Sequence, residues 1–153
     1  MKTPLLFLDF DGVLVTFHKP SGRLAKPNVD CVAQLNRITD ETGARIVVSS
    51  SWRIDSMPKY VVDKLKEWNV SGDVIGQTPW IERHNGHYLE HADRGTEIMA
   101  WLVAHDKVYG PIVILDDESD MGPLLPHLVQ TTFEGGLTRH LAQRAIDHLK
   151  SSS

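Results

Sequence analysis

The stretch that decides the fold is residues 5–14, LLFLDFDGVL, an apolar run that leads into two aspartates and a glycine. A short apolar run bounded by a turn signal is typical of a strand buried on both faces, as in a parallel sheet. Side chains two positions apart on an extended chain point to the same side, so Asp9 and Asp11 are expected to face one crevice. Two carboxylates held this close repel each other unless a cation lies between them or one is protonated. The stretch therefore predicts a cation site, and Mg²⁺ is the candidate because it prefers oxygen ligands.

The rest of the chain alternates short apolar runs with amphipathic segments. Strands are expected at residues 45–48, 73–75, 112–115 and 128–129, and helices are expected to begin near Asn28, Pro58, Arg94 and Leu137. Alternation of this kind favours an α/β domain in which right-handed crossovers place helices on both faces of a parallel sheet. We therefore predict a Rossmann-like, parallel five-stranded sheet in a single domain that spans residues 1–150.

Composition excludes several classes of protein. The chain has 153 residues, of which 41% are hydrophobic and 24% are charged, as in globular proteins. Its net charge of −4 gives no general basic surface for tight binding of nucleic acid. The single cysteine, Cys31, excludes an intramolecular disulfide and a cysteine-only metal site. No apolar run is typical of a signal peptide or a membrane span, so a cytoplasmic location without membrane contact is expected.

Polar clusters follow three of the expected strands. They are Asp9 with Asp11, the serines of residues 49–51, and Asp116 with Asp117. Ligands of parallel α/β sheets bind in the crevice at the carboxyl ends of the strands, so this fold would gather the three clusters at one edge. Solvated polar residues at an ordinary strand end would explain one such cluster, but not three at equivalent positions.

The residues at these strand ends resemble four motifs of the haloacid dehalogenase-like (HAD) hydrolases, most of which are phosphatases. The motifs come in the expected order and cover nearly the whole chain: residues 8–13, residues 47–51, Arg94 near a helix start, and residues 113–117. Residues 50–53, SSWR, followed by Arg94-Gly95, resemble the small subfamily of HAD domains in RNA-repair (Swiss Army Knife) proteins. The resemblance implies a HAD-like sheet with a minimal cap or none.

The resemblance also implies a Mg²⁺-dependent phosphatase that acts through an aspartyl-phosphate intermediate. Asp9 would be the nucleophile, and Asp11 would be first a general acid and then a general base. The Mg²⁺ ligands would be Asp9, the backbone carbonyl of Asp11, and one or both of Asp116 and Asp117.

The substrate phosphate would be held by a serine and a basic residue. Ser50 is expected to bind phosphoryl oxygens and Ser51 is the next candidate, while Ser49 is left open. Arg94 would supply a charge-assisted contact. The family often has lysine in that role, and Lys107 is a distant alternative.

Other functions are open because the same fold carries phosphonatases, dehalogenases and phosphotransferases. Asp11 argues against a dehalogenase, which needs no acid or base at that position. A phospho-receiver-like domain also gathers aspartates around Mg²⁺, but receivers carry their phosphoacceptor on a middle strand. A binding module without activity is disfavoured because no catalytic position is missing. The main alternative is a phosphatase that acts on a small nucleotide or sugar phosphate.

Substrate choice in this superfamily usually depends on an inserted cap, for which little chain remains. An open site suits a phosphate at the end of a larger molecule, such as an oligonucleotide terminus. We expect residues 15–27 to form a flap over the site. A modest basic rim and an aromatic side chain for base stacking are also expected, from Lys19, Arg23 and Arg53 and from Trp52 or Trp80.

Three histidines, His84, His87 and His91, lie in the segment that is hardest to interpret. His87 and His91 have a spacing that binds metal on a helix, but no third ligand is evident. We therefore predict no zinc site there. The sequence leaves the oligomeric state open.

Overall fold

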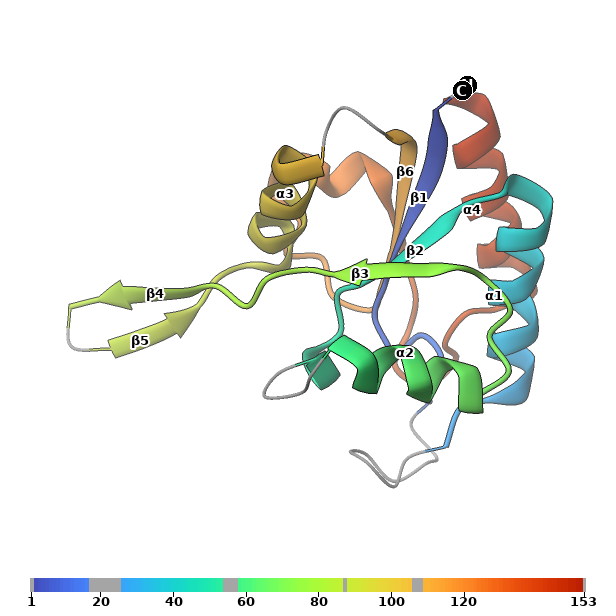
Figure 1. Ribbon diagram of the computed structural model, residues 1–153, viewed down its shortest axis with the longest axis horizontal. Helices are drawn as coiled ribbons and strands as arrows, with labels where there is room; N and C mark the ends of the chain where they lie inside the picture. Colours follow the sequence, from blue (N-terminus) through green and yellow to red (C-terminus); the bar gives the residue numbers. More distant parts are fainter. Residues whose placement is uncertain (1, 17–25, 54–57, 87, 106–108, 153) are drawn as a thin grey trace.

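A parallel five-stranded sheet forms the centre of the computed structural model, which describes residues 2–16, 26–53, 58–86, 88–105 and 109–152 (Figure 1). The strand order is β3-β2-β1-β6-β7, and all four neighbouring pairs are parallel. The strands are β1 (Thr3–Leu8), β2 (Arg45–Val48), β3 (Val74–Gln77), β6 (Tyr109–Asp116) and β7 (Leu128–Gln130). The predicted α/β, Rossmann-like parallel five-stranded sheet is confirmed.

Helices cover both faces of the sheet, as predicted. They are α1 (Val29–Thr42), α2 (Pro58–Glu67), α3 (Arg94–His105) and α4 (Arg139–Ser151), with the short 3₁₀ helices η2 (Ser51–Arg53) and η3 (Gly122–His127). Core residues of α1, α2 and α4 pack together on one face, and those of α3 and η3 pack on the other. Within the described residues, no helix has the length and apolar character that a membrane crossing requires.

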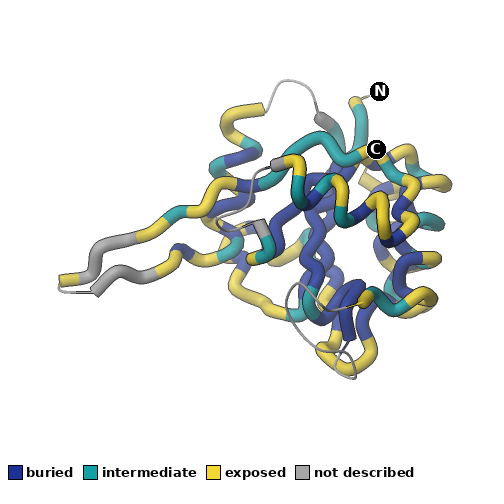
Figure 2. Tube along the Cα trace, turned by 60° about the horizontal axis from the view of Figure 1, so that its bottom comes forward, coloured by how far each residue is buried: buried dark blue, intermediate teal, exposed yellow. Residues whose placement is uncertain are grey.

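The central strand β1 shows why both faces need a cover. Leu6 and Leu8 belong to the core on the α1 side, whereas Leu5 and Phe7 belong to the core on the α3 side. All four side chains are fully buried, in keeping with the alternation of side chains along a strand. Figure 2 shows the same pattern for the sheet as a whole, with buried residues concentrated along the central strands. The continuous apolar run in the sequence is therefore a strand buried on both sides.

The helix ends follow the expected capping rules. The Asn28 side chain accepts a hydrogen bond from the Asp30 backbone N–H at the start of α1, and Gly43, with φ of 72°, ends the helix. The Thr138 side chain caps α4 in the same way by accepting from the Leu141 N–H. The sequence prediction of these helices is confirmed, with small differences at their ends.

An antiparallel hairpin between β3 and α3 was not predicted. It consists of β4 (Glu82–Asn85) and β5 (Tyr88–His91), and it projects from the body of the molecule (Figure 1). Asn85-Gly86 is a common turn pair for tight hairpins, and Gly86 has a φ of 62°. The hairpin is the whole of the regular structure described between β3 and α3. The described residues therefore contain no separate cap domain, and most of the expected flap, residues 17–25, lies outside them.

Candidate active site

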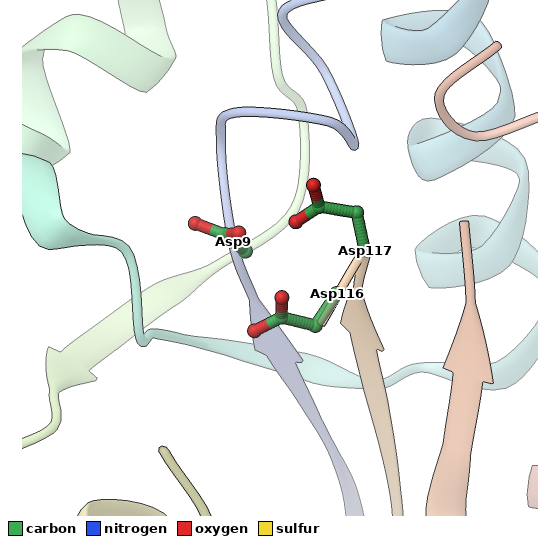
Figure 3. A group of neighbouring side chains, drawn as sticks. All are labelled: Asp9, Asp116 and Asp117. Carbon is green, nitrogen blue, oxygen red and sulfur yellow. The ribbon is translucent and has the colours of Figure 1, made fainter. Parts of the chain in front are cut away.

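Three carboxylates meet at the ends of two neighbouring strands. Leu8 pairs with Leu115, so Asp9 after β1 and Asp116 at the end of β6 lie side by side. One carboxylate oxygen from each of Asp9, Asp116 and Asp117 lies within 4.8 Å of the other two (Figure 3). The structure thus brings together three of the four acids that the sequence suggested for a metal.

Burial opposes the ionisation of Asp9 and Asp116. It raises the pKa of Asp9 well above its usual range, and the nearby Asp116 raises it further. Burial also raises the pKa of Asp116 to about 6, although Arg94 opposes the shift. Both shifts have the same cause, because a charged carboxylate loses its hydration in the protein interior.

The donor set fits a hard divalent cation. Asp116 Oδ2 is buried and accepts no hydrogen bond from the described residues, although Arg94 Nε lies 3.4 Å away. Oxygen-only ligands of this kind suit Mg²⁺ better than zinc or copper. Asp9, Asp116 and Asp117 could therefore bind a metal, as the sequence predicted.

Arg94 enters the same site from the first turn of α3. Its Nη1 donates a hydrogen bond to the Ser49 carbonyl and lies 3.8 Å from Asp9 Oδ1. Burial lowers the pKa of Arg94, but Asp9 and Asp116 more than offset this effect, so the pKa rises. The guanidinium is therefore charged and is held beside the candidate nucleophile. Lys107, the alternative basic residue, lies outside the described residues.

The loop after β6 fixes the start of α3 and hence the position of Arg94. The Arg94 backbone N–H donates to Asp120 Oδ2, and the Gly95 N–H donates to the Asp120 carbonyl, both at 3.0 Å. A side chain on Gly95 would have its Cβ 2.2 Å from the Met121 carbonyl oxygen. The sequence analysis gave Asp120 no role. The one sequence signal for this anchoring of α3 was Gly95, because a glycine permits such a close approach.

The loop after β1 places Gly12 against Asp117. Gly12 has a φ of 80°, and a Cβ at this position would lie 2.6 Å from Asp117 Cγ. The Thr131 hydroxyl donates to the Gly12 carbonyl at 2.5 Å, which ties this loop to the end of β7. Only glycine adopts this positive φ without strain and also leaves room for the Asp117 side chain.

Asp11 lies outside the three-acid cluster formed by the described residues. Its Oδ2 accepts a hydrogen bond from the indole Nε1–H of Trp52, at 3.0 Å. Trp52 belongs to η2, directly after the serine motif, and its backbone N–H donates to Ser50 Oγ at 3.2 Å. Sequence reasoning considered Trp52 for base stacking and missed its contact with Asp11. The structure thus separates the two aspartates of the first motif into different settings.

The three serines after β2 differ in exposure. Ser49 and Ser50 are fully buried, whereas Ser51 is exposed. The Ser49 carbonyl receives the hydrogen bond from Arg94, and Ser50 Oγ receives one from Trp52. Phosphate binding by Ser50 stays a prediction, and Ser51 is the exposed alternative.

The remaining predicted residues lie around the hairpin or in undescribed parts of the chain. His91 is on β5, so its helical spacing from His87 does not arise. Its ring stacks on Trp80, with centroids 3.7 Å apart, and its Nε2 lies 3.0 Å from Glu97 Oε2. Outside the described residues or side chains lie His84, His87, Lys19, Arg23 and Arg53.

Comparison with known proteins gives one family. A family model described as the HAD domain in Swiss Army Knife RNA repair proteins matches residues 5–142. The matched region includes all four sequence motifs and the three clustered acids. No curated protein matches the chain significantly.

The burial of Asp116 predicts a specific pH dependence of stability without metal. Because its folded-state pKa of about 6 exceeds the ordinary 3.8, the protonated group favours folding below about pH 4, and this contribution is lost by about pH 6. In EDTA, Asp116→Asn should therefore gain stability relative to wild type between about pH 4 and about pH 7. Urea unfolding at both pH values measures the gain. The exposed Asp40→Asn is the control, and an equal stability difference at both pH values would contradict the prediction.

The contact between Gly95 and Met121 predicts that Gly95→Ala is harmful. The added methyl group must push α3 away from the loop after β6, at a cost of about 1–3 kcal/mol of unfolding free energy. Because Arg94 is the neighbouring residue, inorganic phosphate should also protect this variant less against thermal unfolding. Gly86→Ala on the hairpin is strained by its φ of 62°, but its Cβ meets no atom within 4 Å beyond its chain neighbours, so it should leave phosphate protection unchanged. Equal protection of the Gly95→Ala and Gly86→Ala variants would refute this role of the helix start.

Proposed function

This chain belongs to the family of HAD domains in Swiss Army Knife RNA repair proteins, and we propose that it is a Mg²⁺-dependent phosphomonoesterase with Asp9 as its nucleophile. One observation carries the proposal: Asp9 lies both in the three-acid cluster and 3.8 Å from the Arg94 guanidinium. A carboxylate that belongs to a metal site and lies beside a fixed cation is well placed to attack a phosphate that is bound by the metal and the cation.

Asp9 would act as an oriented carboxylate. The Phe10 backbone N–H donates to Asp9 Oδ1 at 2.8 Å, which fixes the side chain beside Arg94. Attack requires the ionised form, which burial disfavours and Arg94 favours. When bound, Mg²⁺ would supply further positive charge that favours the ionised acids and offsets the charge of the phosphate.

The reaction would pass through an aspartyl-phosphate in two steps. In the first, an Asp9 oxygen forms a bond to phosphorus, and the bond to the leaving oxygen breaks as Asp11 protonates that oxygen. In the second, Asp11 takes a proton from water, whose oxygen attacks phosphorus and releases Asp9 and inorganic phosphate. Arg94 and the serine loop of residues 49–51 would hold the non-reacting phosphoryl oxygens.

For the substrate, we propose a phosphate at the end of a nucleic acid. Two observations support this class: the family description refers to RNA repair, and the described residues add only a hairpin between β3 and α3. An open site of this kind admits the end of a large molecule and relies on the substrate to exclude water. A small sugar or nucleotide phosphate is the alternative that the same chemistry would serve.

The nucleophile is tested by Asp9→Asn, which keeps the shape of the side chain and removes its nucleophilic oxygen. Release of phosphate from 4-nitrophenyl phosphate should fall by at least about 10³-fold, and EDTA should abolish wild-type turnover. Asp40→Asn, an exposed carboxylate on α1, is the matched control and should retain wild-type activity. Near-normal turnover of Asp9→Asn would rule out the mechanism, and full activity in EDTA would rule out the metal.

The substrate class is tested by comparing kcat/KM values. A 3′- or 5′-phosphorylated oligonucleotide should exceed the corresponding mononucleotide and common sugar phosphates by at least about tenfold, or about 1.4 kcal/mol of transition-state preference. The same ranking should hold at several salt concentrations, since simple charge attraction to the polymer weakens with salt. A tenfold preference for any small phosphate ester would favour the alternative substrate class.

A further inference from the structure

The contact between Trp52 and Asp11 links the loops that follow two neighbouring strands. Asp11 lies just after β1, and Trp52 lies in η2 just after β2, yet the indole Nε1 is 3.0 Å from Asp11 Oδ2. This inference rests on the proposed function, because it assigns a partner to the proposed general acid and base.

The chemistry of indole decides what this contact does. The indole N–H is a hydrogen-bond donor only, so the Asp11 oxygen that it meets must be an acceptor. A carboxyl group that carries a proton has it on one oxygen. Because the carbonyl oxygen of a carboxyl group is the better acceptor, the Trp52 N–H on Oδ2 favours the proton of Asp11 on Oδ1.

The indole ring is itself held in place by other aromatic rings. Trp52, Phe10 and Trp68 contact one another edge to face, with centroid distances of 5.3 to 5.5 Å. Phe10 is fully buried and stands between the two aspartates of the first motif. Edge-to-face pairs restrict ring orientation, so the direction of the indole N–H is set by the packing of the domain core.

We propose that Trp52 is a positioning residue for Asp11: its N–H holds Oδ2 as an acceptor and leaves Oδ1 as the oxygen that exchanges protons with the substrate. In the first step, the P–O bond electrons pass to the leaving oxygen, and the proton on Asp11 Oδ1 passes to the same oxygen. In the second step, Oδ1 takes the proton from the attacking water. Trp52 touches neither the phosphorus nor the leaving group in these steps.

The test depends on how much the leaving group needs a proton. The value of kcat/KM covers steps up to departure of the leaving group, and 4-nitrophenolate departs without protonation, whereas ethoxide does not. General acid catalysis contributes about 10²–10⁴-fold to such steps. Trp52→Phe removes the N–H and keeps an aromatic ring, so it should reduce kcat/KM for ethyl phosphate at least about tenfold more than for 4-nitrophenyl phosphate.

Two further variants separate positioning from packing. Trp68→Phe alters the same aromatic cluster, and Trp68 has no contact with Asp11 among those described. It should therefore reduce kcat/KM for ethyl phosphate and for 4-nitrophenyl phosphate by the same factor. Benzothienylalanine at position 52 has a sulfur atom in place of the N–H and keeps the size of the ring. It should reproduce the selective loss of Trp52→Phe even if the phenylalanine variant folds poorly.

A double variant shows whether Trp52 acts through Asp11. In an Asp11→Asn background no carboxyl group remains to be positioned, so adding Trp52→Phe should leave the ratio of the two kcat/KM values unchanged. Equal losses for both esters in the Trp52→Phe and benzothienylalanine proteins would overturn the inference while leaving the proposed function intact. A wild-type protein that hydrolyses neither ester would overturn both.

Discussion

The candidate active site requires like charges to be held close together inside the protein. Asp9 and Asp116 are buried on adjacent strands, and burial raises the pKa of both. Where the acids are ionised, such a cluster is stabilised by opposite charge, from Arg94 in the protein and from a cation that the acids would bind. The neighbouring features serve this arrangement: Gly12 makes room for Asp117, and Asp120 fixes the helix that carries Arg94. The apolar strands on either side provide the rigid frame on which the charges are held.

Most of the sheet and its helices could be predicted because their signals are local. A continuous apolar run such as residues 5–8 is typical of a central parallel strand, and Asn28 and Gly43 are ordinary helix boundaries. The clustering of Asp9, Asp116 and Asp117 followed from topology, since parallel strands bring their carboxyl ends to one edge. This rule on parallel strands was enough to predict that Asp9 lies close to Asp116 and Asp117, which are far from it in the sequence.

Other parts of the site could not be predicted because their contacts are non-local or their signal is weak. Trp52 and Asp11 are 41 positions apart, and Arg94 and Asp120 are 26 apart, and nothing in either segment specifies its partner. The hairpin strands β4 and β5 lack a clear apolar alternation, so only the Asn85-Gly86 pair indicated a turn. Side-chain contacts between loops depend on packing details that strand and helix patterns do not contain.

The way α3 is anchored bears on how such a domain can diversify. Arg94 is positioned from the loop after β6, through Asp120 and the close approach of Gly95, and not from the hairpin that precedes it in the chain. The root of the hairpin is tied separately, because the buried Glu97 accepts a hydrogen bond from the Ile81 backbone N–H. The segment between β3 and α3 could therefore change in length while the loop after β6 still holds Arg94 beside the acids, provided that the contacts of Glu97 are kept.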